Sequence, residues 1–395
     1  MVVNDYDYII VGGGASGLLL AYRMSQDPYF DTKSILLIEK DFKNENDRTW
    51  CYWEEGIGEW DHLTAKIWDH IYFSSPSYKS NIHLGTARYK MVRSAKWYKF
   101  LKEAIQQHLG ITELHTTVQE INESKEDCQV HTTNGIYTSK KVFNSIPNFS
   151  RLQNQTTFPY LKQHFIGWFI EVEENTFDDS KATFMDFDIP QNGNTRFMYV
   201  LPLTPKKALV EYTMFSHEIL ADDDYEEEII QYLNKMGINN YSVIEKEKGN
   251  IPMTCYPFEK HNSSHILHIG TAGGWTKPST GYTFARTSAF TSKLVTFLKK
   301  EKNLTQFSIK KRHWYYDLVL LDVLDKNNSL GNKIFTSIFQ SSDIQTIFVF
   351  LDEKSNVFTD LKVMLQTKPF FDFFRSALKL ISRWPKIAKR LEKVK

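Results

Sequence analysis

Three glycines near the start of the chain have the spacing that a phosphate-binding loop requires. Gly12, Gly14 and Gly17 follow an apolar run and open a helical pattern. In such a loop the first glycine permits a tight turn, the second lets the backbone approach a pyrophosphate, and the third lets the helix pack on the strand. Glu39 ends the next apolar run, where its carboxylate can bond a ribose hydroxyl and disfavours a 2′-phosphate. The pattern predicts a site for FAD or NAD(H).

A second glycine-rich segment lies at residues 265–300. It predicts a strand, a long helix that begins near Ser279 or Thr280 and, between them, a loop with Gly273, Gly274, Pro278 and Gly281. Together with the first loop, this segment is similar to the FAD-binding fold of hydroxylase-type flavoproteins, although that family usually has Asp where this chain has Thr271. The similarity implies that the helix N-terminus near Gly281 points at the flavin, where its partial positive charge favours the anionic reduced form.

A single acidic residue, Glu211, stands among apolar and aromatic neighbours in a strand predicted within 201–216. By the two-residue alternation of a strand, Leu209, Glu211 and Thr213 share one face. Taken alone, this alternation is compatible with a face in solvent and with a buried one. In the buried case desolvation raises the pKa of a carboxyl group, which then stays protonated near neutral pH and can donate a proton.

The strands and helices that must position these residues belong to a predicted α/β fold with α+β insertions. At 395 residues the chain is long enough for about two lobes. Its mixture of strand and helix patterns predicts a Rossmann-like FAD-binding domain, a β-rich substrate domain and a helical C-terminal region. We place the first at 1–50, 80–150 and 255–300, the second at 51–79 and 151–254, and the third at 301–395.

Composition narrows the classes of function. With 48 basic and 47 acidic residues the net charge is +1, which argues against nucleic-acid binding. The three cysteines are isolated from one another, and His261, His265 and His268 have no acidic or Cys partner nearby, so we expect no metal site. No apolar run approaches the length of about 18 residues that spans a membrane, and no export signal is visible. These features favour a cytoplasmic protein.

The C-terminal stretch at 368–395 is strongly basic. It holds nine Lys or Arg residues against Asp372 and Glu392, interleaved with Phe, Leu, Ile and Trp. A helix of this composition can lie on an anionic membrane surface, because its basic residues meet the headgroups and its aromatic residues the interface. It can equally pack its apolar side on the protein body.

Three segments resemble one family. They read NDRTWCYWEEG (46–56), RFMYVLPLTPKKALVEYTMFS (196–216) and IGTAGGWTKPSTGYTFART (269–287). With the glycine fingerprint, they look like stretches of the bacterial lycopene β-cyclases over roughly residues 5–300. The resemblance implies an enzyme of the intramolecular lyase or isomerase class, which closes the linear ends of lycopene to β-rings, through γ-carotene to β-carotene. It also implies reduced FAD as cofactor, with NAD(P)H as the electron donor and no net oxidation.

The same resemblance assigns roles to residues. The acidic motif of the plant enzymes reads Phe-Leu-Glu-Glu-Thr, so Glu211 carries over as the acid or as the partner of the developing cation, while Tyr212 stands at the second acid. Arg48 would hold the cofactor or order its own loop. Aromatic faces stabilise cations. The candidates, each equally explained by packing, are Trp50, Tyr52, Trp53 and Trp168.

Rival functions use the same fold. An FAD-dependent monooxygenase or a prenyl-chain reductase would consume nicotinamide in proportion to product, and a non-catalytic prenyl or lipid carrier would need neither Glu211 nor reduced flavin. Because lycopene and other linear carotenoids reside in the bilayer, the cyclase interpretation favours a peripheral membrane enzyme. Reduced flavin beside the cation would act as an electrostatic stabiliser or as a base.

Overall fold

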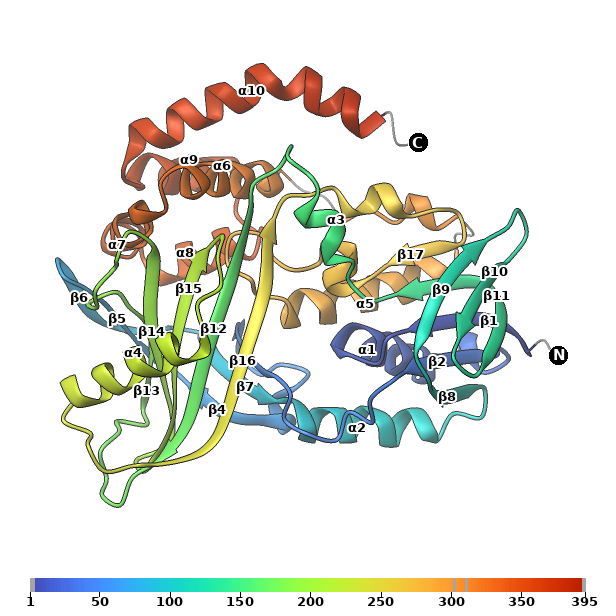
Figure 1. Ribbon diagram of the computed structural model, residues 1–395, viewed down its shortest axis with the longest axis horizontal. Helices are drawn as coiled ribbons and strands as arrows, with labels where there is room; N and C mark the ends of the chain where they lie inside the picture. The colour runs from blue at the N-terminus through green and yellow to red at the C-terminus, as the bar shows by residue number, and fades with distance from the viewer. Residues whose placement is uncertain (1–3, 301–302, 310–311, 393–395) are drawn as a thin grey trace.

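The computed structural model describes residues 4–300, 303–309 and 312–392, with side chains through residue 382 in the last helix. The chain forms two lobes that lie side by side, with a layer of C-terminal helices over one of them (Figure 1). Part of the basic tail predicted at 368–395, including the side chain of Trp384, lies outside the described residues.

The apolar runs near the start of the chain form the centre of a seven-stranded sheet. β1 (Asn4–Val11) and β2 (Ile35–Glu39) are parallel neighbours, and every residue of β2 is buried, as expected for a central strand covered on both faces. The strand order is β8-β2-β1-β11-β10-β9, with β17 beside β11. The other strands are β8 (Ile111–His115), β9 (Val118–Glu123), β10 (Cys128–Thr132), β11 (Gly135–Asn144) and β17 (Ile266–His268).

Three helices share a hydrophobic cluster with one face of β1: α1 (Ala15–Ser25), α2 (Ser94–Gln106) and α5 (Phe284–Leu298). The prediction that the long helix begins near Ser279 or Thr280 is wrong by several residues. Gly281 has φ of 72°, outside the helical region, and its N–H bonds the carbonyl of Lys277. The turn that ends at Gly281 therefore precedes the helix.

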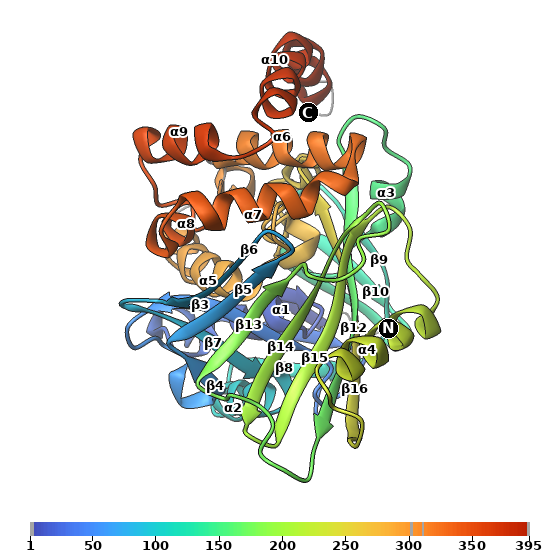
Figure 2. The ribbon, with the colours of Figure 1, turned by 90° about the vertical axis from the view of Figure 1, so that its left-hand side faces the viewer.

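The second lobe is built on another seven-stranded sheet, in the order β16-β12-β15-β14-β13-β5-β6. Its β-rich character follows the prediction. The strands are β5 (His70–Ser75), β6 (Tyr78–His83), β12 (Tyr160–Glu171), β13 (Lys181–Asp186), β14 (Thr195–Thr204), β15 (Lys207–Ser216) and β16 (Ser242–Thr254). α4 (Asp222–Lys235) covers one face of β12 and β15 (Figure 2).

A small antiparallel sheet connects the two lobes. It contains β3 (Thr49–Glu55), β7 (Ala87–Arg93) and β4 (Thr64–Trp68), in that order. Tyr52 of β3 packs in the cluster of the first lobe and Trp53 in that of the second. The predicted domain limits stay a proposal, but those at 50/51 and 79/80 fall inside β3 and β6, which we assign as whole strands. Composition does not change at these points, so the true strand limits cannot be located from the residue pattern.

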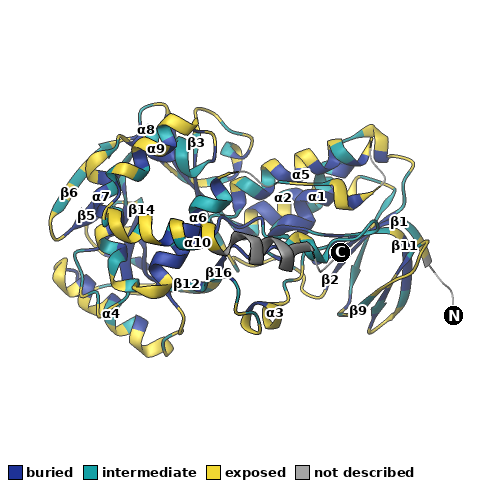
Figure 3. Ribbon diagram, turned by 90° about the horizontal axis from the view of Figure 1, so that it is seen from above, coloured by how far each residue is buried: buried dark blue, intermediate teal, exposed yellow. Residues whose placement is uncertain are grey.

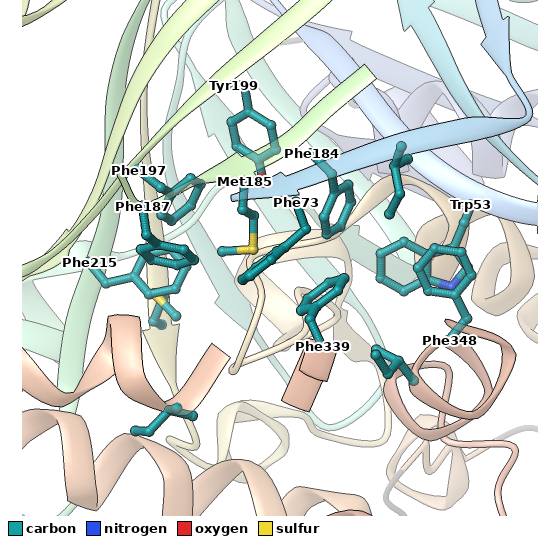
Figure 4. Close-up of a cluster of buried hydrophobic side chains, with 14 of the residues drawn as sticks. Trp53, Phe73, Phe184, Met185, Phe187, Phe197, Tyr199, Phe215, Phe339 and Phe348 are labelled. Atoms are coloured by element: carbon teal, nitrogen blue, oxygen red, sulfur yellow. The ribbon is translucent and has the colours of Figure 1, made fainter. Parts of the chain in front are cut away.

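The C-terminal region is helical, as predicted. Aromatic side chains join it to the second lobe and to the small sheet: Phe339 stacks on Phe73 of β5 at 4.2 Å between ring centres, and Phe348 on Trp53 of β3 at 4.5 Å (Figure 4). Among the described residues, every helix is too short or too polar to cross a bilayer. Besides the short α3 (Phe149–Gln153), the remaining helices are α6 (His313–Lys326), α7 (Gly331–Ser341), α8 (Ile344–Leu351), α9 (Val357–Gln366) and α10 (Phe370–Glu392).

The described part of α10 packs one side on the protein body and leaves the other side exposed. Phe373 and Ala377 pack against the core beneath, and Tyr315 of α6 donates a hydrogen bond to the carbonyl of Ala377 at 2.9 Å. The opposite side is open, with Phe371 83% exposed. Seen from above, this part of the helix is mainly exposed (Figure 3).

Candidate active site

A cavity of about 730 Å³ joins the two lobes. From the first lobe it is lined by the loops after β1 and β11 and by the loop before α5. From the second it is lined by β12, β14, β15 and β16, with β3 and β7 of the small sheet at one side. It therefore brings the first glycine loop and Glu211, nearly 200 residues apart in the chain, into one site.

The first glycine loop has the shape that its spacing predicts. A Cβ at Gly17 would lie 1.8 Å from the carbonyl oxygen of Gly12, so only glycine lets α1 approach the loop so closely. A Cβ at Gly14 would meet nothing within 4 Å, and Gly14 lines the cavity. The space above Gly14 is thus free for a ligand to approach the backbone.

Two buried polar atoms of the cavity have no hydrogen-bond partner among the described residues: Gln163 Oε1 and Thr287 Oγ1. Arg48 also lines the cavity and is exposed there, with its guanidinium on the carbonyl of Asp47 at 2.6 Å. An open glycine loop at a helix N-terminus, unsatisfied polar atoms and a nearby cation together fit a polar, anionic ligand such as a dinucleotide.

Glu39 orders the glycine loop. Its Oε2 accepts the N–H of Gly13 at 2.5 Å and its Oε1 the N–H of Asp41 at 3.0 Å. Glu39 does not line the cavity, so its predicted bond to a ribose stays a prediction, while its role in holding Gly13 is visible.

The residues predicted on the second loop fall on two sides of it. Gly281 lines the site cavity together with Gly270, whose Cβ would lie 2.2 Å from Ser16 Oγ in the first loop. Gly273, Gly274 and Pro278 instead line a separate cavity of about 700 Å³, near α6 and the turn after α8. Different parts of the loop thus face different cavities, and the spacing of the glycines in the sequence does not reveal this.

A buried ion cluster fixes the far side of this loop. Lys277 is 4% exposed on its side chain, and its Nζ lies 2.7 Å from Asp317 of α6 and 3.2 Å from Glu353 after α8. Arg286 of α5 donates to the same Glu353 at 2.7 Å. Although burial opposes ionisation, Lys277 and Arg286 lower the pKa of Glu353 overall. The cluster ties the second glycine loop to the C-terminal helices.

Glu211 lies on the cavity face of β15 and is 8% exposed. Leu209 lines the cavity beside it, whereas Val210 and Tyr212 pack on the opposite face with α4. The alternation predicted for this strand is confirmed, and the alternative of a face in solvent is wrong, because helices and the other lobe cover both faces. A second acid at the position of Tyr212 would point away from the cavity.

The surroundings of Glu211 raise the pKa of its carboxyl group. Burial, and then the negative charge of Glu247, raise the pKa of Glu211 to about 8, although the hydroxyl of Thr213 donates to its Oε1 at 2.5 Å. Tyr199 stands opposite Glu211 in the β14–β15 ladder, and burial holds the pKa of its hydroxyl well above the ordinary value. The site can thus present an un-ionised carboxylic acid near neutral pH.

Of the four aromatic residues predicted as substrate contacts, only Trp50 lines the cavity. Tyr52 packs on Phe284 in the first-lobe core, and Trp53 donates its Nε1–H to Asp352 at 2.9 Å beneath α8. Trp168 follows Gly167 on β12 and therefore points to the α4 side of the sheet. Tyr52, Trp53 and Trp168 therefore do not line the cavity in which a substrate would lie.

The site also contains residues that were not predicted from the sequence. Glu247 lies in the polar stretch EKEKGN, which is typical of an exposed strand. Tyr282 and Tyr89 share a contact of 3.3 Å between their hydroxyl oxygens. Tyr199 falls within the motif quoted at 196–216, so its alternation with Leu201 was the available signal. In the part of the chain that the structure describes, no group of three His, Cys, Asp or Glu is arranged to hold a metal ion.

Solved structures share this architecture at low sequence identity. A geranylgeranyl bacteriochlorophyll reductase-like protein from Thermoplasma acidophilum aligns with a TM-score of 0.56 and 13% identity, covering 100% of both chains. The halogenase PltM in complex with phloroglucinol and FAD aligns with a TM-score of 0.59 and 10% identity, over 98% of this chain and 94% of the halogenase. The chain thus has the fold of the FAD-dependent hydroxylases, halogenases and reductases, as predicted.

The family is defined by sequence. The family model described as "Lycopene cyclase protein" matches residues 7–378, so the chain belongs to the lycopene cyclase family. Lycopene beta cyclase of Nicotiana tabacum is 25% identical over 332 residues, which cover 78% of this chain and 64% of that protein. Lycopene beta-cyclase of Pantoea ananas is 23% identical over 300 residues, 73% and 74% of the two chains. The matched stretch spans 58 to 64% of the tobacco, tomato and pepper proteins, less than two thirds of their length.

Proposed function

We propose that this protein is a lycopene β-cyclase, an enzyme that closes the linear ends of lycopene by proton-initiated cyclisation without net oxidation. One observation carries the proposal: a buried carboxyl group, Glu211, faces the same cavity as the first glycine loop. Membership of the lycopene cyclase family supports the choice of substrate. An acid that stays protonated is what an alkene without polar groups requires.

We propose FAD as the cofactor, held by the N-terminal turn of α1 at Gly14, by Arg48 and by the loop at Gly281. Gln163 and Thr287 would give their unsatisfied polar atoms to it. Bound in its reduced form, FAD supplies negative charge that stabilises a developing cation, and NAD(P)H would keep it reduced.

The residues of the chain account for the remaining chemistry. Glu211 delivers its proton to the terminal alkene, and the tertiary cation closes onto the neighbouring double bond. Aromatic rings that face the cavity stabilise positive charge by about 0.5 to 2 kcal/mol each where water is excluded. The rings that line the cavity include those of Trp50, Tyr89, Tyr199 and Tyr282.

The proposal is tested by anaerobic incubation of the purified protein with lycopene and reduced FAD in deuterated water. We expect a cyclised product that carries deuterium, because the proton delivered by Glu211 exchanges with solvent. No oxygen is needed, and no nicotinamide is oxidised in proportion to product. Mass spectrometry of the product and absorbance of the nicotinamide measure the two quantities.

The rival functions predict different outcomes of the same incubation. Product that forms only with oxygen would identify a monooxygenase. Saturated product with one nicotinamide consumed per bond would identify a prenyl-chain reductase. Binding of lycopene without any conversion, under conditions in which FAD is bound and reduced, would favour a non-catalytic carrier.

Two glycines of the first loop, Gly14 and Gly17, allow cofactor binding and folding to be tested separately. Gly14 has φ of −74°, which any residue adopts, and open space above it, so Gly14→Val should fold normally but block the approach of FAD. We expect the Kd for FAD to rise at least about tenfold in this variant, with an unchanged unfolding midpoint of the cofactor-free protein. Gly17→Val should lower that midpoint, because its side chain meets the Gly12 carbonyl. Wild-type affinity for FAD in Gly14→Val would contradict this placement.

We further propose that the protein is a peripheral membrane enzyme that docks through α9 and α10. Phe358 of α9 and Phe371 of α10 are 86% and 83% exposed. Basic side chains accompany these apolar ones and fit an anionic bilayer surface. This docking face contains the exposed residues Val357, Phe358, Leu361, Lys362, Leu365, Lys368, Phe370, Phe371, Phe374, Arg375, Leu378 and Ile381.

A vesicle assay tests the docking face. We expect the double variant Phe371→Ser with Phe374→Ser to bind phosphatidylglycerol vesicles at least about tenfold more weakly, because two aromatic rings no longer enter the interface. Leu109→Ser is the control, since Leu109 is also exposed but follows α2, a helix on the side of the molecule away from α10 (Figure 1). Equal loss in both variants, or none in the double variant, would exclude α10 as the docking helix.

A further inference from the structure

A second carboxyl group faces the cavity from the strand on the other side of β12. Gly167 of β12 pairs with Glu211 of β15 on one side and with Glu247 of β16 on the other. The three residues therefore lie in one row across the sheet, on one face, with no side chain in the middle position. Neighbouring strands are about 4.8 Å apart, so the two glutamate backbones stand about 10 Å apart and their side chains can converge over the gap.

Gly167 is required for this arrangement. A Cβ at that position would lie 2.8 Å from Leu209 Cδ1 and 3.2 Å from the Glu211 Cβ. The side chain of Glu211 leans over the glycine rather than standing clear of it. Both carboxyl groups line the same cavity.

We propose that Glu247 is the electrostatic partner of Glu211: a second carboxyl group, held ionised across the gap at Gly167, that keeps the single proton of the pair on Glu211. This inference rests on the proposed function, in which Glu211 is the acid. Glu247 acts through Glu211 and is in this sense a positioning residue.

The groups around the two carboxyls decide which of them is ionised. Glu247 accepts a hydrogen bond from the hydroxyl of Thr49 at 2.6 Å, and the positive charges of Arg93 and Arg48 favour its anion. Among the described residues, Glu211 has one such partner, the hydroxyl of Thr213. Burial raises the pKa of both, but the anion is better stabilised on Glu247.

Other titratable groups near the pair do not compete for its proton. Burial raises the pKa of Cys51, Tyr199 and Tyr282, which face Glu211 from β3, β14 and the second glycine loop, so all three stay neutral. Around Glu247 the charged groups are Arg48, Arg93 and Glu245, and the Arg93 guanidinium is itself paired with Glu245 at 2.5 Å.

The pair balances the protons of the cyclisation. The O–H bond of Glu211 breaks as a C–H bond forms at the terminal alkene, and the neighbouring double bond supplies the electrons of the ring C–C bond. Loss of a ring proton leaves its electron pair as the ring double bond. After the first transfer both carboxyls are anions beside the cation, and the released proton restores the single proton of the pair. No oxidant or reductant is consumed.

Infrared titration of the full chain tests the proposal without substrate. The infrared band of protonated Glu211 is identified as the carboxyl band that is present in the wild-type spectrum and missing from the spectrum of Glu211→Gln. We expect its midpoint in the wild type near pH 8, and in Glu247→Gln at least about one pH unit lower, because the opposing negative charge is gone. Glu247→Asp, which keeps the charge, should stay within about half a unit of the wild type.

Thr49→Val is a second variant that leaves both carboxyls in place. Without the Thr49 hydroxyl the anion of Glu247 is less favoured, so the midpoint of Glu211 should also fall. Glu171→Gln, at the exposed end of β12, is the matched control and should leave the midpoint unchanged. A midpoint that moves by less than about half a unit in Glu247→Gln, or that rises, overturns the proposal. Because no turnover is measured, this outcome is independent of whether lycopene is the substrate.

Discussion

Glu211→Gln is expected to lower the rate of cyclisation by a factor of about 10² to 10⁴, the usual contribution of a general acid, while FAD binding is retained. The amide has the shape of the carboxylic acid but no proton to give. It can still accept the hydrogen bond of Thr213, so the local structure should persist. Product formation from lycopene, with bound FAD measured in the same sample, gives both values. A rate within about threefold of the wild type would remove Glu211 from the mechanism.

Stability provides the control for this variant. The pKa of Glu211 is about 8 in the folded protein and the ordinary 4.5 in the unfolded chain. Between pH 4.5 and 8, ionisation of Glu211 in the unfolded chain therefore lowers the free energy of unfolding by about 1.4 kcal/mol for each pH unit. The variant should therefore be more stable than the wild type at pH 7 and nearly equal to it at pH 4.5. Activity of the wild type, which needs the acid form, should fall as the pH rises through 8. Glu171→Gln should change neither property.

Lys277→Met is expected to lower the free energy of unfolding by about 3 to 5 kcal/mol, the usual effect of removing one partner from a buried ion cluster. Methionine fills the space of the lysine stem, but the carboxylates of Asp317 and Glu353 lose the cation that lies 2.7 and 3.2 Å away. Urea denaturation at pH 7 measures the loss.

The same variant has a defined pH dependence. Because the pKa of Glu353 is lowered in the folded protein, its pairing stabilises the fold above the ordinary glutamate pKa of 4.5 and is lost in more acidic solution. The difference between Lys277→Met and the wild type should shrink below that pH. Lys207→Met removes an exposed pair with Glu171 and should cost at most about 1 kcal/mol. Equal effects of the two variants would mean that the buried cluster contributes little.

The fold was predictable where the decisive pattern is local. Gly12, Gly14 and Gly17 stand within six residues, and each has its own steric role beside the strand that precedes it. The face of β15 that carries Glu211 follows from alternation along one strand. The burial of that face does not, because it depends on the other lobe and on the strands beside it, and family resemblance supplied this step.

The rest of the site depends on pairings distant in the chain. The polar stretch EKEKGN predicts that Glu247 is exposed. Glu247 lines the cavity because the register of β16 on β12 places it opposite Gly167. Trp168 was predicted as a substrate contact because an indole ring can stabilise a cation. Its position next to Gly167 in β12 places its side chain on the face of the sheet away from the cavity. Trp53 packs against Phe348 of α8. The residue pattern of β3, the strand that contains Trp53, does not reveal where α8 lies.

The ion cluster at Lys277 also limits where the chain can be split into two fragments that reassemble. The partners of this lysine come from α6 and from the turn after α8, and Trp53 of the small sheet rests on Phe348 of α8. A fragment that stopped after α5 would retain the complete glycine loops yet leave a buried cation without its counter-ions and a tryptophan without its cover. A split version of the protein should therefore reassemble best when the break avoids this junction, for example within the exposed turn at Gly193 between β13 and β14.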